Sequence, residues 1–316
     1  CVVSGVAPMN EAFSAFAQPL IFLFIGSFML AEAIRVHGLD RRLAYGVLGM
    51  RWIQGRPTRI LAAVAFVSAL VSAFISNTAT TAMMVSIVAG MLAAIEEADR
   101  TSKQKLAPEF ATGLFLCVAY AASIGGLATP IGTPPNVIGL TFIRQELNVD
   151  ITFFGWCAIG FPIAASLVTV AVILLSRLFP ANVQQVEGLE TLVSEEQAKQ
   201  GALNRAQKST AVAFGVTVTL WVIPGVIALL FGQEYFLYKW FKLHIPEGLA
   251  ALCGAILLFI LPGNTRADGS CSRVLEWHEA AGIDWGVILL YGGATIVLAL
   301  IAAYWLNSEA LWEALA

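Results

Sequence analysis

Charged residues are scarce in this sequence, and long segments contain none. Only 12% of the 316 residues are Asp, Glu, Lys or Arg, whereas soluble domains carry roughly 25%. Since about 20 apolar residues cross the hydrocarbon of a bilayer, this scarcity excludes a soluble domain and predicts an all-α, multi-pass membrane protein. The uncharged segments cover residues 12–31, 60–95, 110–143, 152–176, 209–233, 248–265 and 285–308.

Several other functional signals are also absent. The five cysteines include no CxxC pair, so neither a disulfide framework nor a cysteine metal site is expected. The net charge is −3 without a basic block, so nucleic acid is not an expected partner. No organic cofactor is expected. Because residue 1 is a cysteine and no signal peptide follows, we expect a truncated N-terminus. The topology predicted below starts the first span outside, so we also expect an upstream membrane segment to be absent from this chain.

The two longest uncharged segments are interrupted by polar or proline-rich residues. In 60–95 the interruption is Ser76-Asn77-Thr78-Ala79-Thr80-Thr81, which leaves arms at 60–75 and 79–95. Each arm of about 16 residues reaches only ~24 Å, so we predict a re-entrant helical hairpin. In 110–143, the stretch Thr129-Pro-Ile-Gly-Thr-Pro-Pro-Asn136 removes amide donors and breaks a helix. It predicts one crossing made of two half-helices.

The distribution of Lys and Arg supports this topology. With a re-entrant hairpin and one broken crossing, fifteen of the 18 Lys and Arg fall on one side and only Arg144, Lys239 and Lys242 on the other. Two full crossings at the break would give 12 to 6. The more asymmetric split is the one that the positive-inside rule favours, and it places the arginine-rich segment 35–59 and the linker 181–208 in the cytoplasm.

A weak internal similarity links the two ends of the sequence. Residues 21–27 (IFLFIGS) resemble residues 287–293 (VILLYGG), and the two segments run in opposite directions across the predicted membrane. This predicts an inverted repeat, of which the chain holds the first copy and the start of the second. A second hairpin and a second broken helix are then expected after residue 316, because Asn307-Ser308 is not a second SNT loop.

Breaks in helices at membrane depth persist where they line a site for a substrate or an ion. Helices starting near Thr81 and Asn136 would direct positive dipole ends at an anion. Hydroxyls, the Asn77 amide oxygen and free carbonyls suit sodium. Neither long segment contains Asp, Glu or His, and proton-coupled transporters usually carry such a group there. Sodium coupling or plain anion exchange is therefore favoured.

The motifs SNTATTAMM (76–84) and TPIGTPPN (129–136) together resemble the divalent anion/sodium symporter (DASS) family of the ion transporter superfamily. The resemblance covers nearly the whole chain. It implies sodium-coupled symport of succinate, malate, fumarate, citrate or sulfate by an elevator-like motion of a homodimer in the inner cell membrane. It does not decide which anion is carried or how many sodium ions are coupled.

The same resemblance implies the residues of the site. Asn77, Thr78 and Thr133 would bind the substrate carboxylate, and Ser72, Ser76, Asn77 and Gly132 would bind one sodium ion. Ser72 precedes Ser76 by one helical turn, so both oxygens would face one ion. The second half of the site is absent from this chain.

We expect five segments. They are a scaffold helix with an interfacial arginine-rich arm (1–58), a transport-domain hairpin and broken helix (59–148), a transmembrane helix (149–180), a solvated cytoplasmic linker (181–208) and the start of the second inverted repeat (209–316). The alternatives to symport are a sodium-independent dicarboxylate exchanger of the same fold and, in another class, a channel or a membrane scaffold protein. An enzyme is not expected, since no nucleophile with a His or Asp partner lies in the uncharged segments.

Overall fold

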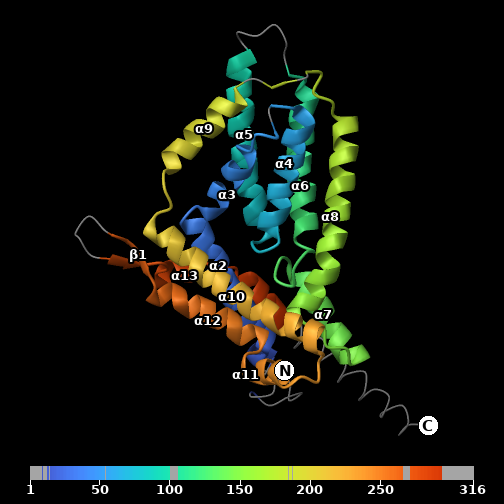
Figure 1. The fold of residues 1–316 in the computed structure, drawn as a ribbon, viewed down its shortest axis with the longest axis vertical. Coiled ribbons are helices and arrows are strands. Elements are labelled where there is room, and N and C mark those ends of the chain that lie inside the picture. Colours follow the sequence, from blue (N-terminus) through green and yellow to red (C-terminus); the bar gives the residue numbers. More distant parts are fainter. Residues whose placement is uncertain are drawn as a thin grey trace.

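The chain folds into a bundle of apolar helices (Figure 1). The structure is a computed structural model that describes residues 9, 13, 15–53, 55–99, 106–183, 185–186, 188–265 and 271–293. Five helices in this part of the chain are long and apolar enough to cross a membrane. They are α2 (Pro19–Val36), α5 (Asn77–Asp99), α6 (Pro108–Gly125), α8 (Phe153–Leu178) and α10 (Arg205–Phe231).

A sixth candidate span is made of two shorter helices. Helices α11 (Phe236–His244) and α12 (Glu247–Ile260) meet at an angle of 63°. In the uncharged segment 248–265 the helix ends at Ile260, because Pro262 cannot extend it and instead opens a strand. This strand, β1 (Pro262–Thr265), pairs antiparallel with β2 (Cys271–Arg273). The multi-pass, predominantly α-helical fold is confirmed.

The remaining elements are shorter. They are η1 (Ala15–Ala17), α3 (Leu39–Leu48), α4 (Pro57–Ser72), α7 (Pro134–Leu147), α9 (Leu189–Gln200) and α13 (Trp277–Ala280). Residues 285–293 are helical too, but the rest of the predicted last span lies outside the described residues, as does Asn307-Ser308.

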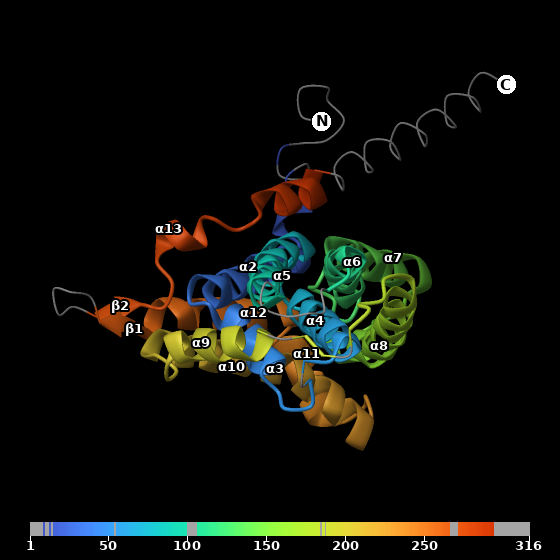
Figure 2. The same cartoon turned by 90° about the horizontal axis from the view of Figure 1, so that it is seen from above.

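The helices form two groups (Figures 1 and 2). Helices α4, α5, α6 and α8 lie side by side, and α2, α10 and α12 cross them obliquely. Glycine permits the closest contacts in each group. A Cβ on Gly26 of α2 would lie 2.5 Å from the Ala251 carbonyl carbon of α12, and one on Gly125 of α6 would lie 2.2 Å from the Ala69 oxygen of α4. These backbones therefore touch without intervening side chains.

The hairpin of α4 and α5 ends at mid-depth of the longer helices. Ala73 at its tip clusters with Ala164, roughly 17 Å along an α8 that is roughly 39 Å long. The neighbouring Phe74 ring meets Phe214 of α10 edge-on, with centroids 5.2 Å apart. The expected arms of equal length are wrong, however. Helix α4 ends at Ser72, whereas α5 runs from Asn77 to Asp99 and is long enough to span by itself.

The linker 181–208 is not the solvated connector that its charges predict. It contains α9, whose Leu189 and Val193 are 2% and 3% exposed and belong to the same core as α4 and α5. The Val186 amide also donates to the Gly55 carbonyl at 2.8 Å. The charged residues of α9, Glu190, Glu195, Glu196 and Lys199, are exposed or partly exposed beside its two buried apolar residues, which is why the sequence average suggested a solvated segment.

The two similar end segments are neighbours in the fold. The rings of Phe24 in α2 and Tyr291 in the last described helix meet edge-on at 6.0 Å. The inverted relation between the segments remains a prediction.

Candidate functional site

The hairpin tip is a turn of four residues between two helices. Ala73 follows the last residue of α4, and Ser76 caps α5, its hydroxyl accepting from the Ala79 amide at 3.3 Å. Helix α5 therefore begins at Asn77 and not near Thr81, since a serine in this place satisfies one of the free amides at a helix start.

Ser72 and Asn77 meet across this turn. The buried Ser72 hydroxyl donates to the Asn77 Oδ1 at 2.7 Å. The helical-turn argument that paired Ser72 with Ser76 is wrong, because α4 ends at Ser72. The turn instead folds Asn77 back over the end of α4. Two neutral side-chain oxygens this close together are ligands that a hard cation accepts.

The proline-rich break between α6 and α7 is fastened to the tip. Thr129, fully buried, donates its hydroxyl to the Ala73 carbonyl and accepts from the Gly132 amide at 3.1 Å. The Asn136 side-chain amide donates to the Gly126 and Thr129 carbonyls at 2.7 and 2.8 Å. Side chains thus satisfy backbone groups that the break releases from the helices.

Two glycines let the break and the tip approach each other. A Cβ on Gly126 would lie 2.6 Å from the Asn77 Oδ1, and one on Gly132 would lie 3.1 Å from the Ala73 oxygen. The structure therefore gathers Ser72, Asn77 and Gly132 in one place. Within the described residues no hydrogen bond to the Gly132 carbonyl oxygen is found.

The two helix starts differ in what they offer an anion. In α5 the Asn77 and Thr78 amides are at the first two positions, which have no intrahelical acceptor. In α7, which begins two residues earlier than expected, those positions are Pro134 and Pro135, favoured there because proline needs no amide partner. The start of α7 thus contributes its dipole but lacks these two donors.

The predicted substrate residues lie at the tip and the break. Thr78 is exposed, as is Ser76, and Asn77 and Thr133 are partly exposed. Thr133 caps α7 without a side-chain hydrogen bond. The neighbours of the Asn77 amide oxygen are Ser72, which donates to it, and Gly126, on which a Cβ would lie 2.6 Å away. Ser76 uses its hydroxyl as a cap.

Sequence reasoning missed Thr129 and Asn136 as the residues that hold the break in place. Both stand at the ends of the motif 129–136, where a buried polar side chain needs a partner. Two further hydroxyls near the tip, of Ser68 and Thr80, are buried without a hydrogen-bond partner in the described structure. Ser68 lies one helical turn before Ser72, and Thr80 lies in the first turn of α5. From the sequence alone, both residues were expected only to pack between helices.

A charge cluster lies at the other end of the broken helix. Asp150 pairs with Arg144 at 3.0 Å and with Lys242 of α11 at 2.5 Å. The Lys242 hydrogen bond, assisted by Arg144, holds the pKa of the Asp150 carboxyl below its ordinary value. Two of the three cations on the predicted outer side are thereby tied to one carboxylate.

A hairpin that stops at mid-depth against a broken helix, within a multi-pass bundle, defines the class of secondary transporters with helix breaks at the membrane midplane. The chain matches the family described as "Sodium:sulfate symporter transmembrane region" over residues 1–311. It belongs to that family, as the two motifs predicted, and it is a multi-pass cell-membrane protein of a transporter family, not an enzyme.

The chain is also similar to curated bacterial transporters. The chain is 30% identical over 291 residues to the sodium-dependent dicarboxylate transporter SdcS of Staphylococcus aureus, in strains USA300, NCTC 8325 / PS 47 and COL. Each match covers 90% of this chain and 53% of the relative. The chain thus spans about half the length of the curated relatives it matches.

Proposed function

We propose that this chain forms part of a sodium-coupled symporter for divalent anions, in particular C4-dicarboxylates such as succinate, malate and fumarate. The observation that carries this proposal is the junction of the hairpin tip with the helix break, where Ser72, Asn77 and Gly132 gather. Family membership supports sodium as the coupling ion, and the description of the relatives supports a dicarboxylate. Citrate and sulfate are further members of the same chemical class.

Sodium would bind at the junction. The Ser72 hydroxyl oxygen, the Asn77 amide oxygen and the Gly132 carbonyl oxygen supply neutral ligands, and Ser76 would add a fourth by releasing the Ala79 amide. In the structure the Ser72 hydroxyl proton lies between two of these oxygens. A cation would turn that proton away, so that both oxygens face the ion, and would draw the tip and the break together.

The anion would bind beside the cation. The Asn77 and Thr78 amides at the start of α5 supply donors, and the hydroxyl of the partly exposed Thr133, which makes no capping hydrogen bond, would supply another from the break. Bound sodium would offset part of the substrate's charge, which couples the two binding events. This chain would supply half of the substrate site.

The two helix groups support an elevator-like mechanism. The group of α4, α5, α6 and α8 carries the junction, and the group of α2, α10 and α12 would be the scaffold, with a second copy of the chain as its partner in a homodimer. A sodium-independent exchanger of the same fold is the alternative, since it needs the anion site but not the cation site.

Transport assays separate these functions. Proteoliposomes containing the full-length protein are tested for uptake of labelled succinate and sulfate, with and without an inward sodium gradient. We expect succinate uptake that requires sodium. Ser72→Ala should raise the sodium concentration required at least several-fold, whereas Ser123→Ala, whose hydroxyl bonds only within its own helix, should not. Uptake that depends on internal dicarboxylate but not on sodium would establish the exchanger.

A further inference from the structure

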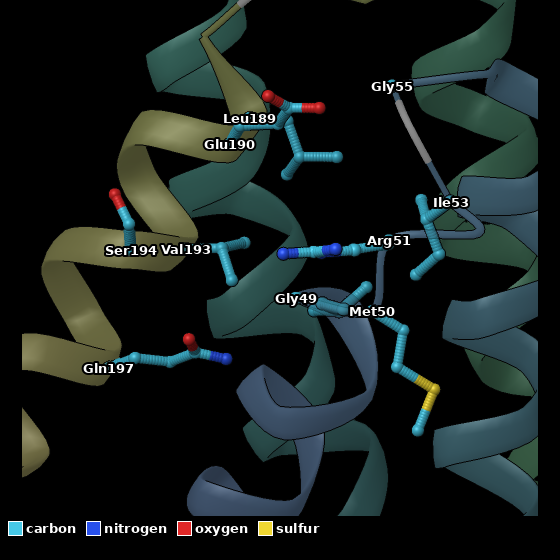
Figure 3. Close-up of a pocket in the computed structure, with 11 residues that line it drawn as sticks. Gly49, Met50, Arg51, Ile53, Gly55, Leu189, Glu190, Val193, Ser194 and Gln197 are labelled. Atoms are coloured by element: carbon cyan, nitrogen blue, oxygen red, sulfur yellow. The ribbon is translucent and has the colours of Figure 1, made fainter.

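A cavity lies far from the junction, between the turn that joins α3 to α4 and the face of α9 (Figure 3). Its volume is about 360 Å³, enough for a small polar headgroup. One wall is lined by Leu48, Gly49, Met50, Arg51, Ile53 and Gly55, and the other by Leu189, Glu190, Val193, Ser194 and Gln197. Since α9 lies in the linker that we had expected to be solvated, this cavity was not predicted.

Hydrogen bonds fix both ends of the cavity. At one end the Val186 amide donates to the Gly55 carbonyl at 2.8 Å, and Gly55 adopts a φ of +63° that favours glycine. At the other end the Gln197 side-chain amide donates to the Tyr45 carbonyl at 2.7 Å. Beyond it, Arg42 donates to the Gln200 carbonyl at 2.8 Å. The cavity is therefore a built feature of the fold.

The lining combines an apolar floor with one cation and one anion. Ile53, Leu189 and Val193 are nearly fully buried and form the floor. The Arg51 side chain extends across the space toward α9, and Glu190 lies toward the α9 start (Figure 3). In the described structure neither charge has an ion-pair or hydrogen-bond partner, and they do not pair with each other. A ligand with separate negative and positive groups would satisfy both.

The surroundings place this cavity at a membrane surface. Met50 and Trp52, beside Arg51, expose 48% and 47% of their surface. Tryptophan and arginine gather at the headgroup level of a bilayer, and basic segments favour the cytoplasmic leaflet. Arg59 donates to the Trp52 carbonyl and holds the turn in place.

We propose that this cavity binds the headgroup of an amine-bearing phospholipid, a phosphatidylethanolamine, from the cytoplasmic leaflet. The Arg51 guanidinium receives the phosphate, since its planar donors match phosphate oxygens. Glu190 accepts from the primary ammonium. The acyl chains leave past Met50 and Trp52 into the bilayer. The lipid thereby holds α9 to the arginine-rich arm, independently of sodium or substrate.

Lipid binding to the full-length protein tests this proposal. The purified, delipidated protein is titrated by native mass spectrometry with phosphatidylethanolamine, phosphatidylglycerol and phosphatidylcholine of identical acyl chains. We expect phosphatidylethanolamine to bind most tightly, because phosphatidylglycerol lacks the cation and phosphatidylcholine has no ammonium proton to donate. Arg51→Gln should weaken its binding by about tenfold or more, as for loss of a hydrogen bond to a charged group. Glu190→Gln should remove the preference among the three lipids.

Arg56→Gln is the matched control, because Arg56 is exposed in the same turn but does not line the cavity. Equal effects of Arg51→Gln and Arg56→Gln would show a general surface charge effect and overturn the proposal. Displacement of the lipid by free phosphoethanolamine at equal concentration would overturn the assignment to a lipid. If Arg51→Gln fails to fold, the wild-type protein is crosslinked with a photoactivatable phosphatidylethanolamine instead. The proposal requires crosslinks at residues that line the cavity, and crosslinks found only elsewhere would overturn it.

Discussion

Thr129 provides the sharpest test of how the helix break is held against the hairpin tip. Its hydroxyl is fully buried, donates to the Ala73 carbonyl and accepts from the Gly132 amide at 3.1 Å. Thr129→Val preserves the shape of the side chain and deletes both bonds. The Gly132 amide keeps a second acceptor, the Thr129 carbonyl at 3.3 Å, whereas the Ala73 carbonyl loses the only side-chain donor found for it in the described structure.

The expected cost follows from that difference. Leaving one buried carbonyl without its donor costs about 1–3 kcal/mol, and the Gly132 amide adds little. Thr129→Ser keeps the hydroxyl and removes one methyl group, for about 0.8 kcal/mol. The free energy of unfolding in detergent, from denaturant titration, measures both.

Thr169→Val is the control, because the Thr169 hydroxyl is exposed and bonds only to the Ala165 carbonyl of its own helix at 2.7 Å. It should change the free energy of unfolding by less than about 0.5 kcal/mol. If Thr129→Val costs no more than Thr129→Ser and Thr169→Val, the hydroxyl does not fasten the break, and the reasoning from the tip geometry is refuted.

Further predictions concern the substrate, the topology and the surface charges. Thr133→Val should weaken dicarboxylate binding roughly 10- to 150-fold, as for a lost hydrogen bond of about 1.5–3 kcal/mol to a charged group, while Thr133→Ser retains most binding; equal, small effects in calorimetry would make Thr133 a packing residue. Cysteines introduced at Arg59 and Glu96 should both react with an impermeant reagent from the cytoplasmic side only; labelling from opposite sides would disprove the re-entrant hairpin. Asp150→Asn should lower the free energy of unfolding at pH 7 by up to about 1 kcal/mol, as expected of an exposed ion pair.

The pH dependence of the Asp150 effect has a defined sign. The pKa of this carboxyl is lowered in the folded state, so its stabilising contribution is present above its unfolded pKa and is lost as the pH falls through the folded pKa. Denaturant titrations between pH 7 and pH 3 should therefore show the wild type approaching Asp150→Asn. A difference that stays constant over this range would contradict the ion pair with Lys242.

Some features of the fold could be predicted because single residues determine them locally. Pro130, Pro134 and Pro135 lie within six residues and separate two helices, since proline lacks an amide donor. The single prolines Pro162 and Pro224 are instead accommodated inside α8 and α10. The uncharged segments predict spans since hydrocarbon excludes charge. The start of α5 was misplaced by four residues because Ser76 was assigned to a polar loop, although its hydroxyl could cap a helix.

The membrane class, the helix break, the residues of both motifs and, through their resemblance, the family all follow from the amino-acid sequence. These are properties of composition and of short segments. The folded structure was needed to show that Asn77 folds back onto Ser72, that Thr129 and Asn136 fasten the break to the tip, and that α9 packs onto the arginine-rich arm. Each of these is a contact between separate elements, whose partner is chosen by the packing of whole helices, and no local pattern of residues encodes that choice.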